Sequence, residues 1–410
     1  MTSAYLLYID PGTGSMLFSL FIGLAAAATF GLRALFMKLK FVLSGGKVSK
    51  EDSKNIPFVI FSDHKRYWNV FKPICDEFEK RGVDVVFYTA SPDDPALKAE
   101  YTHVKAEYLG EKNRPYAKLN MLHADLLLAT TPGLDIYQWK RSKGVKCYVH
   151  IPHSISDFAG YRQFALDYYD SVIASGENQL PSMRKLEELR PSLRKKEFKV
   201  VGSTYLDSMK KRLDSMEKHE PNQKKIVLVA PTWGKSGILS KFGEKFLAAL
   251  QKTGFKIIVR PHPQSVVSEQ NILKPLQEKF SDFEWNFDND NFDVLNRADI
   301  MITDFSGVMF DYSLVFDKPL IYTDTEFDKS PYDADWLDEP MWEFTILDKL
   351  GIQLKEEQFD DMQNVIEKAI ASESLKESRK EVRSAAWQNQ GRAAEASVEY
   401  LINKRDSLIS

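Results

Sequence analysis

The clearest indication of the architecture is the run Ala298-Asp299-Ile300-Met301-Ile302-Thr303-Asp304-Phe305-Ser306-Gly307-Val308-Met309-Phe310-Asp311-Tyr312. Its part from Asp299 to Thr303 is short and apolar, which is typical of a buried parallel strand. Hydroxyls, a carboxylate and a glycine follow up to Gly307, and apolar residues at helical spacing come next. A polar turn between a strand and a helix leaves unpaired N–H groups at the helix start, where phosphate binds well. Taken alone, the run slightly favours an ordinary capped corner, because Thr, Asp and Ser are preferred N-caps.

The same alternation of strand and helix recurs in two stretches of the chain. Apolar strand-like runs separated by amphipathic helical patterns extend from Pro57 to Gly202, and the pattern restarts after a charged stretch. This alternation predicts an α/β fold with two Rossmann-like domains, at 56–207 and 224–400, built on parallel sheets. Long helices are expected near the end of the chain, over 359–371 and 374–408. Two such domains face each other across a cleft, and ligands bind beyond the carboxyl ends of the strands.

A membrane-length run without charges precedes the two domains. Residues 14–32 carry no charged side chain, and a bilayer core of about 30 Å needs about 20 such residues in a helix. A signal peptide would have a positive segment before this run, whereas the charge there is Asp10. The basic residues follow instead, from Arg33 onward, and the positive-inside rule then leaves both domains in the cytoplasm. We expect one N-terminal transmembrane helix within 1–45 and a single-pass protein of the cell membrane; a core helix of a soluble domain is the alternative.

The composition argues against several classes of protein. The chain has 410 residues and a net charge of −3, so it lacks the basic surplus that nucleic-acid binders need. Its two cysteines, Cys75 and Cys147, have no metal-ligand spacing, which argues against a disulfide scaffold and a structural zinc site. Asp288-Asn289-Asp290 resembles a metal-binding pair of aspartates, but no third ligand is in view and such residues are common in turns. We assign neither a metal nor a nucleic-acid partner.

Polar clusters follow the predicted strands in both domains. Each places histidine, arginine or hydroxyl side chains directly after an apolar run. The clusters are His150-Ile151-Pro152-His153-Ser154, Ala230-Pro231-Thr232-Trp233-Gly234, Arg260-Pro261-His262-Pro263 and Thr303-Asp304-Phe305-Ser306-Gly307. One such cluster is uninformative. Four clusters in the same order of strand then site argue for a cleft that binds a phosphate-bearing ligand.

Three of these runs also carry a resemblance to a known family. Ala230-Pro231-Thr232-Trp233, Arg260-Pro261-His262-Pro263 and the run from Thr303 to Tyr312 resemble the CDP-glycerol glycerophosphotransferase family, the teichoic acid primases and polymerases, in order and spacing. The resemblance implies the GT-B arrangement of two Rossmann-like domains, and no cofactor. It also implies transfer of glycerol phosphate, or a related polyol phosphate, from a CDP-alcohol such as CDP-glycerol to a hydroxyl, with release of CMP. The acceptor would be a membrane-associated, lipid-linked glycan or polyol phosphate in cell-wall polymer synthesis.

Two departures from the family pattern lie in the first half of the chain. The family's first-domain histidine stands in a His-Gly-Thr-Pro-(Leu/Ile)-Lys run, whereas His153 is followed by Ser154-Ile155-Ser156-Asp157. A Gly-x-Pro-Arg turn of the family is Gly202-Ser203-Thr204-Tyr205 here, without the arginine. Both departures are expected on the acceptor side of the cleft. A different acceptor, or a different alcohol on the donor, is therefore an open alternative.

The expected catalytic roles follow from phosphoryl transfer. An attacking hydroxyl needs a base, and the phosphates need positive or hydrogen-bonding partners. His153 is the expected base because it lies after a strand, in a loop that Pro152 stiffens, and His150 is the alternative. His262, next to Arg260, would hydrogen-bond the diphosphate and help CMP to leave.

The other candidates belong to the second domain and would bind the donor. Thr303, Ser306 and Gly307 would donate hydrogen bonds to the phosphates, and Arg260 and Thr232 belong to the same substrate-binding group. Asp304 is unfavourable next to an anion, so it would hold the loop or bind the glycerol hydroxyls. Asp311 would contact the ribose or make a structural hydrogen bond.

Other functions also fit these patterns. A GT-B glycosyltransferase or a sugar-nucleotide epimerase would use a similar diphosphate site, and release of UDP from a UDP-sugar would identify it. A membrane-anchored binding protein that has lost the acceptor chemistry is a further alternative. The changed run after His153 keeps that alternative open.

Overall fold

The protein divides into two compact units, 1–55 and 56–410, and both sheets lie in the second unit. The computed structural model describes residues 28, 29, 32, 55–217, 223–288, 290–323, 327–329, 334–337 and 339–410. None of the helices in this described part has the length and apolar character that a bilayer crossing requires. The membrane anchor predicted within 1–45 lies almost entirely outside the described residues.

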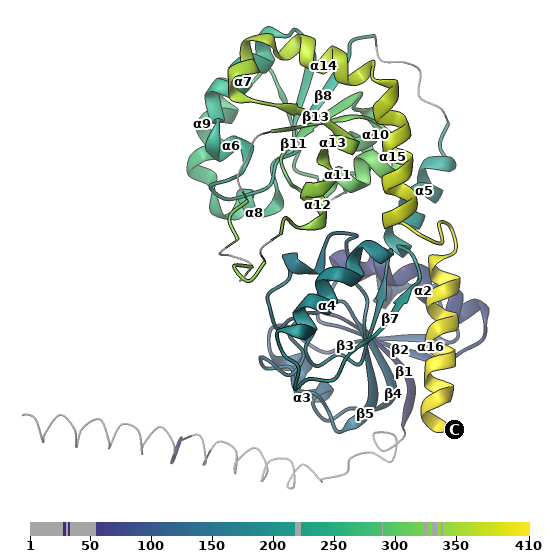
Figure 1. Cartoon of the computed structure of the whole chain (residues 1–410). Coiled ribbons are helices and arrows are strands. Elements are labelled where there is room, and N and C mark those ends of the chain that lie inside the picture. The colour runs from purple at the N-terminus through teal and green to yellow at the C-terminus, as the bar shows by residue number, and fades with distance from the viewer. Residues whose placement is uncertain are drawn as a thin grey trace, which may run out of the picture. The chain divides into compact units, whose positions relative to one another are not determined.

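The predicted α/β class is confirmed by fully parallel sheets (Figure 1). Among the described residues, the first sheet has seven strands in the order β3-β2-β1-β4-β5-β6-β7. The strands are β1 (Ile56–Ser62), β2 (Val85–Thr89), β3 (Val104–Tyr108), β4 (His123–Ala129), β5 (Gly144–His150), β6 (Ser171–Ala174) and β7 (Glu197–Val200). The central strands are nearly continuous apolar runs, as strands covered on both faces require; β4 is buried at every residue after His123. We call this sheet with its flanking helices the first lobe.

Alternate side chains of β1 enter two separate cores of the first lobe. Phe58 and Ile60 pack with α2, whereas Val59 and Phe61 pack on the opposite face with residues of α3 and α4. The alternation follows from the two-residue period of a strand. The helices are α2 (Trp68–Lys80), α3 (Arg114–Leu119) and α4 (Leu180–Glu188).

The second sheet brings the remaining predicted clusters to one edge. In the described part of the chain it has six parallel strands, in the order β10-β9-β8-β11-β12-β13. The strands are β8 (Ile226–Val229), β9 (Lys256–Val259), β10 (Glu284–Trp285), β11 (Ile300–Thr303), β12 (Leu320–Thr323) and β13 (Gly351–Leu354). Val229 lies opposite both Val259 and Ile302 in the ladder, so the loops after β8, β9 and β11 leave the sheet side by side. This sheet and its helices form the second lobe.

Helices cover the second sheet and continue from its loops. They are α6 (Ile238–Lys241), α7 (Gly243–Lys252), α8 (Pro263–Ser268), α9 (Gln270–Lys279), α10 (Phe292–Arg297), α11 (Val308–Phe310), η5 (Asp311–Val315), α12 (Trp342–Thr345), α13 (Leu347–Leu350) and α14 (Met362–Ile370). α14 corresponds to the helix predicted at 359–371. The turn between β11 and α11 is the corner that the sequence singled out.

The helix predicted at 374–408 is interrupted, which corrects the sequence expectation. α15 (Glu373–Ala386) stays with the second lobe, whereas α16 (Ala393–Ile409) packs on the first lobe and buries Val398 in the core around α2 (Figure 1). The end that was predicted for the second domain, residue 400, therefore falls inside a helix of the first lobe. An amphipathic pattern shows that a helix has a buried face, but it does not show which lobe covers that face.

Close backbone contacts fix the place where the chain passes between the lobes. Gly202 has a φ of +99°, and a Cβ there would lie 2.4 Å from the carbonyl oxygen of Gln388, so glycine is required. The Asp207 carboxylate in α5 (Thr204–Asp214) accepts the N–H of Gly391 at 2.8 Å, where the chain breaks between α15 and α16. The first-domain end predicted at residue 207 lies inside α5.

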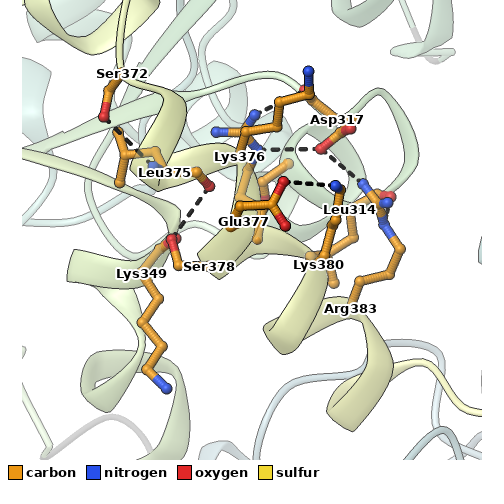
Figure 2. A network of polar contacts seen from close by, with 12 residues as sticks. Leu314, Asp317, Lys349, Ser372, Leu375, Lys376, Glu377, Ser378, Lys380 and Arg383 are labelled. Atoms are coloured by element: carbon orange, nitrogen blue, oxygen red, sulfur yellow. Dashed lines mark hydrogen bonds and ion pairs between the residues drawn. The ribbon is translucent and has the colours of Figure 1, made fainter.

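α15 clamps the chain that follows the β11–α11 corner (Figure 2). Arg383 donates from Nε to the Leu314 carbonyl at 2.7 Å and pairs with the Asp317 carboxylate at 3.0 Å. One turn earlier, Ser378 donates to the carbonyl oxygen of Lys349 at 2.6 Å, at the end of α13. These contacts hold η5 and α13 against one helix and so support the corner from behind.

Candidate functional site

A cleft of about 550 Å³ lies between the two lobes, lined by loops that follow their strands. Its volume is in the usual range for a small-molecule site. From the first lobe it is lined by residues that include Arg66, Tyr67, His153, Ser154, Ser156, Asp157 and Tyr161, and from the second by Thr232, Trp233, Arg260, His262, Ser306, Gly307 and Asp311. Seven of the nine predicted site residues are thus in this lining, and Thr303 and Asp304 are buried behind it.

Asp304 holds the loops of the second lobe together. Its side chain is 1% exposed and accepts the N–H groups of Thr232 at 2.9 Å, Ile238 at 3.2 Å, Phe305 at 2.8 Å and Ser306 at 3.1 Å. Burial raises the pKa of Asp304 to about 6, and these N–H groups oppose that rise. The geometry corresponds to the first of the two roles predicted for Asp304, which is to hold the loop.

Thr303 differs from its predicted role as a phosphate donor. It is fully buried, and its hydroxyl donates to the Ala230 carbonyl at 2.8 Å, inside the sheet. Ser306 and Gly307 do line the cleft. A Cβ placed on Gly307 would lie 4.0 Å from the hydroxyl oxygens of both Ser154 and Ser156, so the corner faces the first-lobe loop at close range.

His153 lies on the first-lobe wall of the cleft. Its ring stacks on Tyr161, with centroids 6.2 Å apart and planes 16° apart, and its centroid is 5.1 Å from that of Tyr67. His153 is exposed on the cleft wall, but the surrounding protein reduces the hydration of its charged form, and this desolvation, helped by the charge of Arg66, lowers the pKa of His153 from 6.5 to about 4. The imidazole is therefore neutral at pH 7, which is the form that accepts a proton.

His150, the alternative base, is packed in the core of the first lobe. It ends β5, is fully buried and is surrounded by the rings of Phe158, Tyr161 and Tyr169. Among the described residues, neither of its ring nitrogens has a hydrogen-bond partner. Burial lowers its pKa from 6.5 to about 3.

The loop that follows His153 is held from both lobes. On the first-lobe side, Gln179 donates from Nε2 to the carbonyl oxygens of Ser154 at 3.2 Å and Ser156 at 2.8 Å. On the other side, the N–H of Asp157 donates to Glu343 in α12 at 3.2 Å. Sequence reasoning missed Glu343, because it stands in no recognisable motif.

Arg260 and His262 lie on the second-lobe wall in fixed orientations. Arg260 donates to the Asn286 side chain and, at 2.7 Å, to the Asp288 carbonyl. His262 caps α8 and accepts the N–H of Gln264 at Nδ1, at 3.1 Å. The neutral ring therefore carries its proton on Nε2. Burial lowers the pKa of His262, so this neutral donor form is favoured at pH 7.

Asp311 connects the second lobe to α5. Its carboxylate accepts the Tyr205 hydroxyl at 2.9 Å and the Asn291 amide at 3.3 Å. Tyr205 occupies the position at which the family pattern has an arginine. The Tyr205 hydroxyl is a neutral donor, so no positive charge at this position opposes the effect of burial. Burial raises the pKa of Asp311 to about 7. Sequence reasoning noticed the missing arginine but not the hydroxyl that takes its place.

The aspartate pair that the sequence raised, and His64 after β1, have local roles. His64 caps the turn η1 (Lys65–Tyr67) by accepting the N–H of Arg66 at Nδ1. Asp290 accepts the N–H of Phe292, the first residue of α10, at 3.0 Å. Within the described residues, no group of three or more acidic, histidine or cysteine side chains is placed to hold a metal ion.

Residues 202–338 match the sequence profile of the family described as CDP-glycerol:poly(glycerophosphate) glycerophosphotransferase. This range contains all three runs on which the resemblance rested. The predicted resemblance to this glycerophosphotransferase family is confirmed over that range.

A curated relative supports the resemblance to this family. The teichoic acid glycerol-phosphate primase of Bacillus spizizenii is 25% identical over 173 residues, which are 40% of this chain and 43% of the relative. The match therefore spans less than half the length of that relative.

Solved structures share the fold of this chain. The wall teichoic acid polymerase TagF has a TM-score of 0.60 and 16% identity, over 95% of this chain and 99% of that chain. A Listeria monocytogenes protein assigned as a UDP-N-acetylglucosamine 2-epimerase has a TM-score of 0.54 and 12% identity, over 86% of this chain and 97% of that chain. At these identities the likeness concerns the arrangement of the two α/β lobes.

Proposed function

We propose that this protein moves glycerol phosphate, or a related polyol phosphate, from a CDP-alcohol to an acceptor hydroxyl and releases CMP. The observation that carries the proposal is the meeting of His153 and His262, from opposite lobes, in one cleft beside the Ser306–Gly307 corner. A base and a donor on opposite walls suit an in-line phosphoryl transfer, in which the attacking and leaving oxygens lie on opposite sides of phosphorus.

The donor binds to the second lobe in this mechanism. Arg260 and the corner at Ser306 and Gly307 contact the diphosphate, and His262 donates from Nε2 to the phosphate of the CMP leaving group. Preorganised donors aimed at developing negative charge lower the barrier most where water is excluded. Thr232 shapes this site through its main chain, because its N–H is bound by Asp304.

The acceptor approaches from the first lobe. Its hydroxyl oxygen forms the new bond to the phosphorus that carries glycerol, while the bond from that phosphorus to the bridging oxygen of CMP breaks. The hydroxyl proton goes to His153, which is neutral at pH 7 because desolvation in the cleft lowers its pKa. CMP then leaves with the bridging oxygen.

The setting of the reaction follows from the named relative and from the first residues of the chain. The curated relative is a teichoic acid primase, so we place this protein in the synthesis of a teichoic acid-type polymer on a membrane-associated, lipid-linked acceptor. The uncharged run 14–32 and the basic residues after it would hold the enzyme on the cytoplasmic face of the cell membrane.

The full-length chain is tested with CDP-glycerol, CDP-ribitol and UDP-sugars in the presence of lipid-linked acceptors. We expect release of CMP and a gain of polyol phosphate by the acceptor, both lost in His153→Ala. Release of UDP without CMP would instead favour a glycosyltransferase or an epimerase. No release of either nucleotide, with CDP-glycerol still bound, would favour a binding protein.

A further inference from the structure

A segment of the second lobe makes direct hydrogen bonds with the first lobe at the edge of the cleft. The main-chain N–H of Asp157 donates to Oε2 of Glu343 in α12 at 3.2 Å. The N–H of Trp342 in turn donates to the Asp157 carboxylate at 3.0 Å. The other oxygen of that carboxylate accepts the N–H of Ala159 at 2.9 Å, two residues along the loop. Asp157 is therefore fixed to α12 by two hydrogen bonds and to its own loop by a third.

Burial makes these hydrogen bonds hard to replace. Asp157 and Glu343 are 8% and 6% exposed, and next to them Ala159, Leu337 and Met341 form a small buried cluster to which both lobes contribute. A buried N–H without a partner costs about 1–3 kcal/mol. Since Glu343 accepts the N–H of Asp157, the loop cannot leave α12 without losing this partner.

The same helix is fastened to the corner of the second lobe at which the donor phosphates are expected. The Trp342 ring stacks on the ring of Phe310, with centroids 5.5 Å apart and planes 18° apart. Phe310 ends α11, directly after the corner. The Phe344 ring lies near the ring of Phe305, the residue before Ser306, with centroids 5.8 Å apart. α12 thus packs against aromatic rings that precede and follow the corner in the sequence.

One path of contacts therefore joins the two walls of the cleft. It runs from the loop that carries the expected base through Asp157 to α12, and from Trp342 through Phe310 to the corner. The hydrogen bonds from Gln179 hold the same loop only to its own lobe, so they do not set its distance from the corner. Reacting groups must lie about 3–3.5 Å apart and aligned, and a misplacement of about 1 Å can cost about 100-fold in rate.

We propose that Glu343 is a positioning residue for the transfer, because its hydrogen bond to Asp157 sets the place of His153 relative to the donor phosphates at the corner. The inference rests on the proposed function and adds a residue to it. In this role Glu343 acts through Asp157 and need not contact either substrate. Its loss should lower the rate of transfer and leave the affinity for the donor nucleotide unchanged.

The test compares variants of the full-length chain at position 343. Glu343→Ala removes the acceptor of the Asp157 N–H, whereas Glu343→Gln keeps an acceptor oxygen. Glu339→Ala is the matched control, since it removes an exposed carboxylate four residues earlier. In Glu343→Ala we expect kcat for CMP release from CDP-glycerol, with a lipid-linked acceptor, to fall about 10- to 100-fold. The affinity for CDP, measured by titration calorimetry, should stay that of the parent, and the other two variants should keep parental values of both quantities.

Hydrogen exchange gives a readout that does not depend on the reaction. The main-chain amides of residues 154–160 should exchange faster in Glu343→Ala than in the parent and should stay protected in Glu343→Gln. Melting temperatures of all variants then set an assay temperature at which each is folded.

A second variant tests the same path at its second-lobe end. Trp342→Leu keeps the main-chain N–H that Asp157 accepts but removes the ring that stacks on Phe310. It should lower kcat in the same direction and leave CDP affinity unchanged. This variant decides the matter if Glu343→Ala does not fold, and a parental kcat in it would contradict the path.

Three results at position 343 would overturn the inference. They are a parental kcat or unchanged exchange of 154–160 in Glu343→Ala, weaker CDP binding in that variant, and a Glu343→Gln as slow as Glu343→Ala, which would make the carboxyl itself a participant. If the parent released no CMP from CDP-glycerol, the proposed reaction would fail. The exchange of 154–160 would then decide by itself whether Glu343 holds the loop.

Discussion

The main-chain N–H of Asp157 donates to Oε2 of Glu343 at 3.2 Å, and the Asp157 carboxylate accepts the N–H of Trp342 at 3.0 Å. The two hydrogen bonds thus fasten the loop at Asp157 to the start of α12, and the side chains of Asp157 and Glu343 are both buried. The contact ties the loop that carries His153 to α12. Burial, together with the charge of Asp157, raises the pKa of Glu343 to about 8, so this carboxyl is protonated at pH 7.

The raised pKa of Glu343 predicts a pH-dependent stability. Between its ordinary pKa of 4.5 and about 8, the folded protein keeps a proton that the unfolded chain has lost, so stability falls as pH rises through this window. Glu343→Gln removes this ionisation, and its melting temperature should fall less than that of the parent from pH 6.5 to pH 8, above the range in which the lowered pKa values of His150 and His153 act in the opposite direction. Asp311 contributes in the same direction as Glu343, so the slope should diminish and not vanish. Glu357→Gln, at an exposed position, should leave the slope unchanged, and an unchanged slope in Glu343→Gln would contradict the prediction.

A second prediction concerns the donor site. Ser306→Ala and His262→Ala should each lower CDP-glycerol turnover about 10- to 100-fold, because a hydrogen bond to a charged group contributes roughly 1.5–3 kcal/mol. Both side chains lie in loops outside the packed sheet, so the far-UV spectrum should stay that of the parent. Ser268→Ala and His123→Ala are matched controls at exposed positions outside the described cleft lining. Parental rates in both cleft variants would place the donor site elsewhere.

A third prediction separates structural from ligand-binding roles at the corner. Asp304→Asn keeps one acceptor oxygen but cannot satisfy all the N–H groups that the carboxylate now accepts. Since an unsatisfied buried donor costs about 1–3 kcal/mol, we expect a loss of at least about 2 kcal/mol in the free energy of unfolding. Urea denaturation measures this loss. A variant with parental stability and weaker donor binding would give Asp304 the other predicted role, contact with the glycerol hydroxyls.

The sequence was sufficient for the fold where local pattern and burial coincide. The buried strand from Asp299 to Thr303 had an apolar run of the right length, and the parallel sheet then required the clusters at Arg260 and Ser306 to share an edge. Thr303 shows the limit of this reasoning. Which hydroxyl faces the cleft depends on the alternation of side chains at the strand end, and the pattern gives this only to within a residue or two.

Long-range packing accounts for the other differences. The chain breaks between α15 and α16 at Gly391, whose N–H donates to the Asp207 carboxylate. These two residues lie nearly two hundred positions apart in the sequence, and no local propensity encodes such a contact. Nothing in the sequence around Glu343 distinguishes it from other acidic residues. Its raised pKa arises from burial and from the charge of Asp157, which is distant in the sequence. Arg66 was passed over because a single arginine beside a tyrosine has no spacing that distinguishes it from a surface pair.

A fourth prediction tests the membrane anchor, whose residues lie outside the described part of the chain. The full-length protein should sediment with membranes, and its C-terminus should be cleaved by protease only from the cytoplasmic side. Removal of residues 1–45 should release a folded protein, because β1 begins at Ile56. Recovery of the full-length chain in the soluble fraction would contradict the anchor.

The last prediction concerns the base. His153→Ala should lower transfer about 100- to 10,000-fold, as loss of a general base does, and leave CDP-glycerol binding nearly intact, because the donor is held by the second lobe. Because the pKa of His153 is lowered to about 4, the parent should lose activity on acidification only below pH 6.5. An acid limb centred at or above pH 6.5 would contradict a base whose pKa is lowered by desolvation in the cleft.

His150→Phe is the discriminating variant, because it keeps an aromatic ring among Phe158, Tyr161 and Tyr169 and removes the titratable nitrogens. The pKa of His150 is lowered to about 3, so the parent loses stability as pH falls from 6.5 toward 3, when the unfolded chain takes up a proton that the folded protein excludes. His150→Phe should flatten the melting temperature over that range and keep transfer activity. If His150→Phe abolished transfer at pH 7 while His153→Ala retained it, the base would be His150. If neither variant lost transfer, the changed run after His153 would mean that another group takes the proton.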